Sequence, residues 1–514
     1  MAESKDDQAA RLTLPDRIVS WLNPIAGVRR TNARRVLAYY EAAKADRTRK
    51  GRRETASGND AVLRAGSSLR QQARHFEQNY DIALGVLNTL VNNIVGPKGI
   101  GIEPQPRRKD GSIDYDLAQK ILALYKKWCR RPEVTRKHSW ASAQRLLCRS
   151  WVRDGEVFAQ QLMGPVQFLK HSSAVPYSLE MLECDFVPME LYSTSPTTVQ
   201  GIEINSWGEA LAYRVYRTNP IESMGLTAIA DTKRIPAASM LHLGNVHRIR
   251  QLRGVSVFAS VLGRFDNLKD YEESERIAAM IAASMAAYIK KGEPDDYTPE
   301  GNVTNRNLKF KPGMIFDDLR PGEEIGTIDT KRPNPNLEIY RNGQIRAIAA
   351  GSGPSFSSIS RTYDGTYSAQ RQELVEGWSN YAVLSDEFIS CIVQPTWENF
   401  IATAVLSGQL QVPAEVLPET IDDAEFIPPQ MPWIDPVKEA EAWAALTRAG
   451  FASEVEVIRR RGGNPMDVLE QISNFRLRAK AKQLILDSDA AVSRATAPVA
   501  PEQGEEPRRS PPAE

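Results

Sequence analysis

Few residues of this chain have the type and spacing that a metal or catalytic site requires. His242 and His247 are five residues apart around a predicted turn, which is poor geometry for two ligands on one helix. Asp422 and Asp423 stand beside proline and glutamate, and are best explained as part of a solvated loop. We therefore predict no metal site.

The cysteines also give no sign of reactive chemistry. They are far apart in the sequence and form no Cys-x-x-Cys pair, so we expect reduced thiols that fill apolar space in a cytoplasm-like compartment. The four are Cys129, Cys148, Cys184 and Cys391.

The common motifs of nucleotide and ester hydrolysis are missing as well. The sequence contains no GxxxxGK[ST] loop, no HExxH and no GxSxG. The glycine cluster GPKGIG at 96–101 follows a predicted helix instead of opening one, so its context is wrong for a phosphate-binding loop. We expect a protein that is not an enzyme and has no cofactor, although two distant carboxylates would be enough for acid–base chemistry.

The charge balance argues against a protein that coats nucleic acid. The chain has 65 Lys and Arg against 64 Asp and Glu, a formal charge of +1, so any contact with DNA should be local or loose. Ten basic residues nevertheless gather between Arg29 and Arg53. This segment either contacts an acidic partner or DNA, or is a solvated arm. The apolar stretch Ile277–Ile289 has 13 residues, too short for the roughly 20 of a membrane span.

The hydrophobic pattern indicates an α+β fold. Apolar residues recur at helical spacing over 69–95, and further helices are expected at 114–129 and 140–154. Strand-like runs such as EVFAQQLM and ALAYRVYR then fill residues 155–250, separated by Gly, Pro and Asn turns. We expect this β-rich layer to pack on the preceding helices.

The longest helix candidate lies at 266–291. No proline occurs between Pro236 and Pro294, and 26 helical residues would extend about 39 Å. Its second half is rich in alanine, so its sides are thin. That composition favours close packing against neighbouring helices, while an ordinary core helix remains the alternative.

The remaining segments alternate between turns and helices. A second helix is expected at 336–350, a turn-rich segment at 351–368, and a third helix from 369 toward 404. A turn-rich insertion with short strands at 308–310 and 313–316 precedes the second helix. An acidic, proline-bearing stretch at 415–435 and a helical block at 436–487 follow the third.

Eight segments, in order and spacing, resemble the portal proteins of the lambda family of phages. The resemblance extends along nearly the whole chain. The segments are RRVLAYYEAAKADRTRKG, LRQQARHFEQNYDIALGVLNTLVNNIVGPKGIGIEPQP, WASAQRLLCRSWVRDGEVFAQQL, LEMLECDFV, GIEINSWGEALAYRVYR, IPAASMLHLGNVHRIRQLRGVSVFASVLGRFDNLKDYEESERIAAMIAASMAAYI, IAAGSGPSFSSISRTYDGTYSAQRQELVEGW and WIDPVKEAEAW.

The resemblance implies a subunit of a ring, with an α+β wing, a stem of long helices, a small clip, a channel (tunnel) loop and a helical crown. The ranges are a basic, partly disordered N-terminal arm at 1–63, the wing at 64–253, a stem helix at 254–291, the clip at 292–335, a second stem helix at 336–350, the channel loop at 351–368, a long helix with a return to the wing at 369–434, the crown at 435–487 and a disordered tail at 488–514.

The resemblance also implies which residues act. Stem packing between subunits would involve Ala279, Ala282, Ala283 and Ala286, and docking of partners at the clip would involve Lys309, Lys311 and Arg320. In the channel loop we expect Gly365 to let the backbone bend. The residues expected to face DNA are Ser355, Ser357, Ser358, Ser360, Arg361, Thr362, Tyr363, Thr366 and Tyr367.

The implied function is a ring of about twelve copies at one capsid vertex, through which double-stranded DNA is packaged and ejected without sequence specificity. Its partners would be the terminase large subunit, the major capsid and scaffold proteins, and later the head-completion or connector proteins. It would be assembled in the host cytoplasm and end in the virion. The alternatives are a DNA-processing enzyme, such as a nuclease or terminase, and a membrane-surface scaffold that uses the basic arm.

Overall fold

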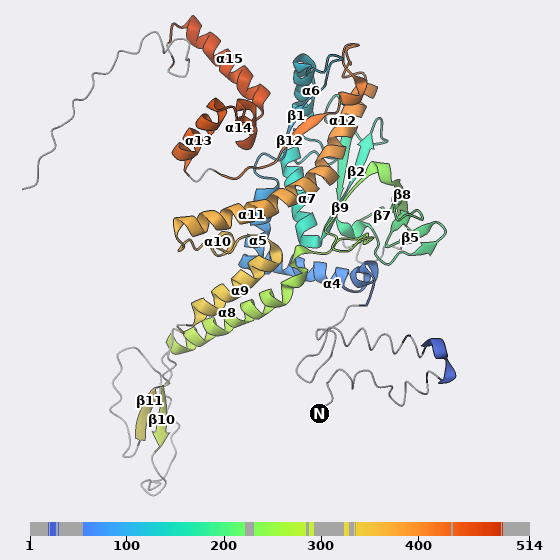
Figure 1. Ribbon diagram of the computed structural model, residues 1–514. Coiled ribbons are helices and arrows are strands. Elements are labelled where there is room, and N and C mark those ends of the chain that lie inside the picture. Colours follow the sequence, from blue (N-terminus) through green and yellow to red (C-terminus); the bar gives the residue numbers. More distant parts are fainter. Residues whose placement is uncertain are drawn as a thin grey trace, which may run out of the picture. The chain divides into compact units, whose positions relative to one another are not determined.

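The structure, a computed structural model, describes residues 19, 21–26, 29, 55–220, 231–283, 287–291, 323–327, 334, 336–432, 435–484 and 486 (Figure 1). The chain divides into two units, Met1–Ala61 and Val62–Glu514, and the account below concerns the second. Helices and several antiparallel sheets occur together, which confirms the predicted α+β class. Over the residues described, no helix combines the length and the apolar character of a membrane span.

The first helical region consists of two helices, whereas the sequence predicted one over 69–95. Helix α4 covers Gly58–Asn79 and α5 covers Asp81–Ile94. They are separated by Tyr80, whose backbone is extended (φ −143°, ψ 118°). The ring of Tyr80 is buried 5.9 Å from that of Phe265, and its hydroxyl donates to Glu272 at 3.2 Å. These long-range contacts fix the break, which the local helical pattern could not indicate.

The predicted helices and strands of the next region are present. Helix α6 is Tyr115–Trp128, capped by the side chain of Asp114, and α7 is Trp140–Asp154, capped by Ser139. A three-stranded antiparallel sheet has the order β3-β2-β9, and a five-stranded sheet has the order β4-β5-β6-β7-β8. The strands are β2 Glu156–Met163, β3 Tyr177–Leu182, β4 Ser193–Thr194, β5 Thr197–Val199, β6 Ile202–Ile204, β7 Ala210–Tyr216, β8 Thr232–Pro236 and β9 Met240–Gly244.

The third long helix returns the chain to this region. Helix α11 (Tyr367–Phe388) continues through one π-helical turn, Ile389–Val393, into α12 (Gln394–Leu406). Trp397 and Phe400 of α12 pack on the ring of Tyr125, with centroids 5.1 and 5.3 Å away. Strand β12 (Ala424–Ile427) then pairs antiparallel with β1 (Gly101–Pro104). Segments more than 270 residues apart thus share one aromatic core.

The long helix candidate ends earlier than predicted. Helix α8 covers Leu262–Ala283, and residues Ala287–Lys291 form strand β10, paired antiparallel with β11 (Glu323–Thr327). The helix prediction was therefore wrong for 287–291. Tyr288 and Ile289 favour strands, and the register sets Lys290 opposite Glu324. This non-local pairing replaces the helical conformation that the alanine-rich sequence favours.

The second predicted helix packs against α8. Helix α9 covers Leu337–Ser352, and the rings of Tyr271 and Tyr340 lie 4.4 Å apart. Arg341 donates to Glu272 at 2.7 Å, and Arg264 donates to Gln344 at 3.0 Å. The remaining helices are α10 Phe356–Ser360, α13 Pro436–Arg448, α14 Glu454–Arg460 and α15 Pro465–Ala481, with short 3-10 turns at Cys184–Phe186, Ala237–Ser239, Val257–Ser260 and Pro418–Thr420.

A fully buried ion pair between Arg253 and Glu156 lies where the chain leaves the sheets and enters α8. The carboxylate of Glu156, at the start of β2, accepts from Nε and Nη2 of Arg253, with contacts of 2.6–2.9 Å. Arg253 also donates to the backbone carbonyls of Cys184, Val187 and Gln200. A Cβ on Gly254 would lie 1.9 Å from the carbonyl oxygen of the residue before Glu156, so glycine is required there.

We expect Arg253→Met to lower the free energy of unfolding by about 3–5 kcal/mol, because it leaves Glu156 buried without its partner. The matched control is Arg217→Met, since Arg217 pairs with Asp231 at the surface and its loss should cost less than about 1 kcal/mol. Urea denaturation followed by tryptophan fluorescence measures both. Equal losses in the two variants would contradict the role of the buried pair.

Candidate functional site

The segment from Ser355 to Tyr367 joins α9 to α11 and contains a short helix. Residues Phe356–Ser360 form α10, where the sequence predicted turns throughout. The hydroxyl of Ser355 caps this helix by accepting from the backbone N–H of Ser358. Ile359 is buried, and the guanidinium of Arg346 lies 4.8 Å from the centre of the Phe356 ring. Local capping and these two contacts explain why the turn-rich sequence forms a helix.

The serine hydroxyls of α10 bond within the chain. Ser357 donates to Glu373 of α11 from both its backbone N–H (3.0 Å) and its Oγ (2.8 Å). The hydroxyls of Ser355 and Ser358 are 2.7 Å apart, and Ser360 Oγ accepts from the N–H of Thr362 at 3.2 Å. These four serines and Thr362 are half-buried. Their contact with DNA remains a prediction.

The exposed part of the segment follows α10. Arg361 ends that helix in the left-handed conformation (φ 59°), and the backbone bends at Gly365, as predicted. Arg361 and Thr366 are exposed, and so are Tyr363 (59%) and Tyr367 (56%). This rim therefore presents one guanidinium, two phenol rings and a hydroxyl, with Asp364 as the nearest acid in sequence.

Of the four predicted stem alanines, the structure describes the side chain of one. Ala279 is exposed on α8. Ala282 and Ala283 belong to α8, but their side chains, like all of Ala286, lie outside the described residues. The clip residues Lys309, Lys311 and Arg320, and the strands expected at 308–310 and 313–316, also lie outside them.

Apolar side chains that the sequence analysis did not single out are exposed on α8 and α9. Ile277 and Met280 of α8 are 46% and 60% exposed, and Ile339 of α9 is 73% exposed. Ile277 follows the buried Leu268 by nine positions, which is half a turn around the helix. That spacing is the signal that could have revealed a second apolar face. We call Ile277, Met280 and Ile339 the outer apolar face.

The histidine, cysteine and aspartates that were candidates for chemistry make structural contacts or are buried and protonated. His242 stacks on Phe158 at 4.3 Å, and no cluster of three or more potential metal ligands occurs in the part of the chain that the structure describes. Burial raises the pKa of the Cys129 thiol to about 12, so it is protonated at neutral pH. The backbone carbonyls of Asp422 and Asp423 accept from Trp397 Nε1 and Gln105 N–H.

Comparisons with known proteins give one consistent result. Residues 44–384 match the family described as phage portal protein, lambda family. A probable portal protein of Halomonas phage phiHAP-1 is 24% identical over 437 residues, 82% of each chain. Portal protein B of Escherichia phage lambda is 21% identical over 303 residues, 53% of this chain and 56% of that protein.

Two solved structures are similar over most of the chain. One is the neck of an empty GTA particle computed with C6 symmetry, with a TM-score of 0.43 and 15% identity, covering 78% of this chain and 94% of that one. The other is the neck of a native GTA particle computed with C12 symmetry, with a TM-score of 0.41, 15% identity and the same coverage.

We expect Glu373→Ala to release α10 from α11, because it removes both charge-assisted bonds to Ser357. Trypsin cleavage after Arg361, identified by mass spectrometry, should become about tenfold faster, while the midpoint of thermal unfolding changes little. Glu376→Ala is the control, since Glu376 accepts from Gln372 within its own helix and makes no bond to α10 among the described residues. Unchanged cleavage in the Glu373 variant would contradict the anchoring role.

Proposed function

Since this chain belongs to the lambda family of phage portal proteins, we propose that about twelve copies form a ring at one vertex of a capsid, through which double-stranded DNA enters and leaves. The observation that carries this proposal is the family match, which includes strands β1 to β11, α8, α9 and the segment 355–367. We infer a channel protein of the virion, assembled in the host cytoplasm, that hydrolyses neither nucleotide nor DNA.

The parts of the fold suit the parts of such a subunit. Residues 64–253 with the return through α12 and β12 would be the wing, and α8 with α9 would be the stem. Strands β10 and β11, which lie between α8 and α9 in the sequence, would belong to the clip, although the sequence analysis placed residues 287–291 in the stem (Figure 1). Helices α13 to α15 would form the crown.

The outer apolar face supports contact between stems of neighbouring copies. In a cyclic ring each contact is heterologous, so one face of a subunit must fit a different face of the next. The hairpin of α8 and α9 buries Leu268 and Ile345 on its inner side and exposes Ile277, Met280 and Ile339. Burial of these three in a ring would remove them from water, and the small, exposed Ala279 of α8 would let helices approach closely on its own side.

The exposed rim after α10 suits a surface over which DNA slides. Each Lys or Arg that neutralises a phosphate releases counterions and strengthens binding, so many cations would hold the duplex in place. One Arg361 per copy, with hydroxyls and phenols around it, gives weak contacts that are blind to sequence. Summed over a ring, such contacts would resist backward slippage and still allow the duplex to advance.

The clip would dock the terminase large subunit during packaging and head-completion or connector proteins afterwards. Lys309, Lys311 and Arg320 remain our candidates for this contact, because a mixed, charged surface favours exchangeable partners. The major capsid and scaffold proteins would surround the ring at the vertex.

We expect Ala279→Trp to reduce ring formation strongly, because the indole would separate stems that must lie close together. The helix itself should tolerate the change at a cost of about 0.5 kcal/mol. Mass photometry measures the fraction of rings, with Ala123→Trp on the exposed side of α6 as the control for adding tryptophan to a helix. Normal assembly of the Ala279 variant would remove this face of α8 from the subunit contact.

Replacement of residues 355–367 by a short Gly-Ser link should leave ring assembly and incorporation into proheads intact. Packaging should begin, but DNA should leak back, because the ring would lack the contacts that resist slippage. Electron microscopy of the heads and phage titre measure the result, and partly filled or empty heads are expected. Full heads at normal titre would mean that the segment only connects α9 to α11.

A further inference from the structure

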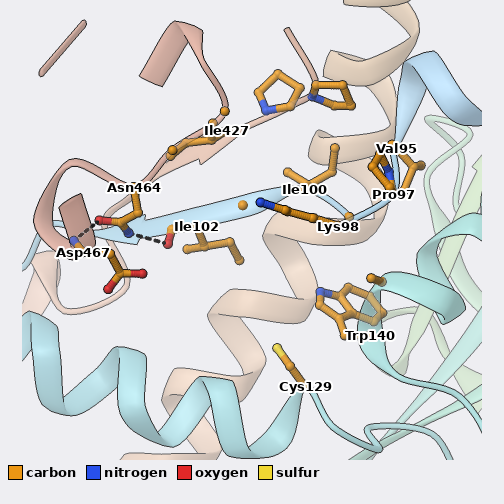
Figure 2. Close-up of a pocket in the computed structure, with 18 of the residues that line it drawn as sticks. Val95, Pro97, Lys98, Ile100, Ile102, Cys129, Trp140, Ile427, Asn464 and Asp467 are labelled. Carbon is orange, nitrogen blue, oxygen red and sulfur yellow. Dashed lines mark hydrogen bonds between the residues drawn. The ribbon is translucent and has the colours of Figure 1, made fainter. Parts of the chain in front are cut away.

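A groove of about 730 Å³ lies between the first strand and the last helix of the structure (Figure 2). Its walls come from the glycine loop at 96–101, from β1, from the starts of α7 and α15, and from the chain that follows β12. None of the roles proposed above uses this groove. Its chemistry is suited to an extended peptide.

The edge of β1 that borders the groove carries a free backbone donor. The N–H of Gln105 donates to the carbonyl of Asp423, so the backbone groups of Gln105 point toward the chain of β12. These directions alternate along an antiparallel strand of regular register, so the N–H and C=O of Ile102, three residues earlier, point away from β12. Its carbonyl accepts from Asn464 Nδ2 at 3.3 Å, a bond drawn in Figure 2. Its N–H bonds to no residue in the described ranges. The N–H of Ile100, on the same edge, donates to Gln144 Oε1 at 2.8 Å, so side chains already bond to this edge on both sides of the Ile102 N–H. One peptide group of an extended ligand could therefore bond there.

A buried polar group at the floor of the groove is also poorly hydrogen-bonded. The indole of Trp140 is 3% exposed, and its Nε1 makes no hydrogen bond of normal geometry, although the buried hydroxyl of Tyr125 lies close enough to interact with it. Trp140 lies across the groove from β1 (Figure 2). A buried N–H without a well-placed acceptor is costly, so a ligand that brings a carbonyl oxygen here would be stabilised.

The rim of the groove is positively charged. Lys98, Lys126 and Arg461 line it, and Asp467, which pairs with Lys126 at 2.9 Å, is the acid among the lining residues. Lys98 is exposed. The groove therefore favours a ligand that carries carboxylates.

The chain itself supplies a matching sequence after α15. Residues 498–507 read PVAPEQGEEP, with three glutamates and no lysine or arginine. Helix α15 starts at the groove and has 17 residues, so its far end is roughly 25 Å away. The thirteen residues 485–497 could extend roughly 43 Å, which is more than enough to return.

We propose that residues 498–507 of the same chain bind this groove in an extended conformation. The backbone carbonyl of one non-proline residue of this segment would accept from the N–H of Ile102, and the N–H of the same residue would face the same edge of β1. The glutamates of the segment would lie near Lys98. Bound in this way, the segment would bridge the sheets and the helices α13 to α15.

Hydrogen exchange of the fragment 98–104 tests the proposal in the whole protein. A chain that ends at residue 487, and a full chain with Glu502, Glu505 and Glu506 changed to Lys, should both exchange the Ile102 amide at least tenfold faster than the unchanged chain. Fragments from β2 should not change. A synthetic peptide of residues 498–507 should restore protection to the shortened chain.

A reversal of charge at Lys98 tests the contribution of the groove to binding. Lys98→Glu should weaken binding of the fluorescein-labelled peptide to the shortened chain about five- to tenfold in fluorescence anisotropy, and Lys120→Glu, an exposed lysine of α6, should leave it unchanged. Equal exchange of the full and shortened chains, or equal peptide binding by both lysine variants, would overturn the proposal. If the protection of the Ile102 amide disappears when the protein is diluted, the bound segment comes from a neighbouring copy, and this result would also overturn the proposal.

Discussion

The buried pair of Arg253 and Glu156 determines how the sheets and the α8–α9 hairpin are joined. Burial alone would raise the pKa of Glu156, but the charge of Arg253 holds it well below its usual range, so the carboxylate stays ionised at neutral pH. Two desolvated charges are tolerable only if every hydrogen bond is made. Arg253 meets that condition through three backbone carbonyls, and this requirement fixes the path of the chain from β3 to β5 around it.

The position of the exposed segment 355–367 also depends on the start of α8, because α9, which precedes this segment, packs there. The last turn of α9 lies against the start of α8, since a Cβ on Gly351 would be 2.6 Å from Val261. Asn380 of α11 donates to the carbonyl of Gly353 at 3.3 Å, and Glu373 holds α10. The rim around Arg361 is therefore positioned by contacts at both of its ends. A displacement of the first turn of α8 would therefore move the rim around Arg361, because α9 packs on that turn and leads into the rim.

The sequence was a good guide where elements are governed by local pattern. The helices at 140–154 and 337–352 and the strand at 156–163 follow their periodicity, capping residues and turns. It failed where distant residues decide. Tyr80 breaks a helix because it packs on Phe265, and Ala287–Lys291 forms a strand because β11 lies beside it. The roles of Arg253 and Glu373 depend on partners 97 and 16 residues away, which spacing alone does not reveal.

Internal pairing removes several arginines of this chain from its surface. Three arginines of α4 and α7 bond to carboxylates: Arg74 and Arg153 share Asp154, and Arg149 bonds to Glu77. In Arg74 burial opposes the charge, yet the bonds to Asp154 raise its pKa, so it remains charged and paired. Cations used in this way are not available to phosphates. Each such pair uses one base and one acid, so it leaves the formal charge of the chain unchanged while it reduces the number of guanidinium groups at the surface.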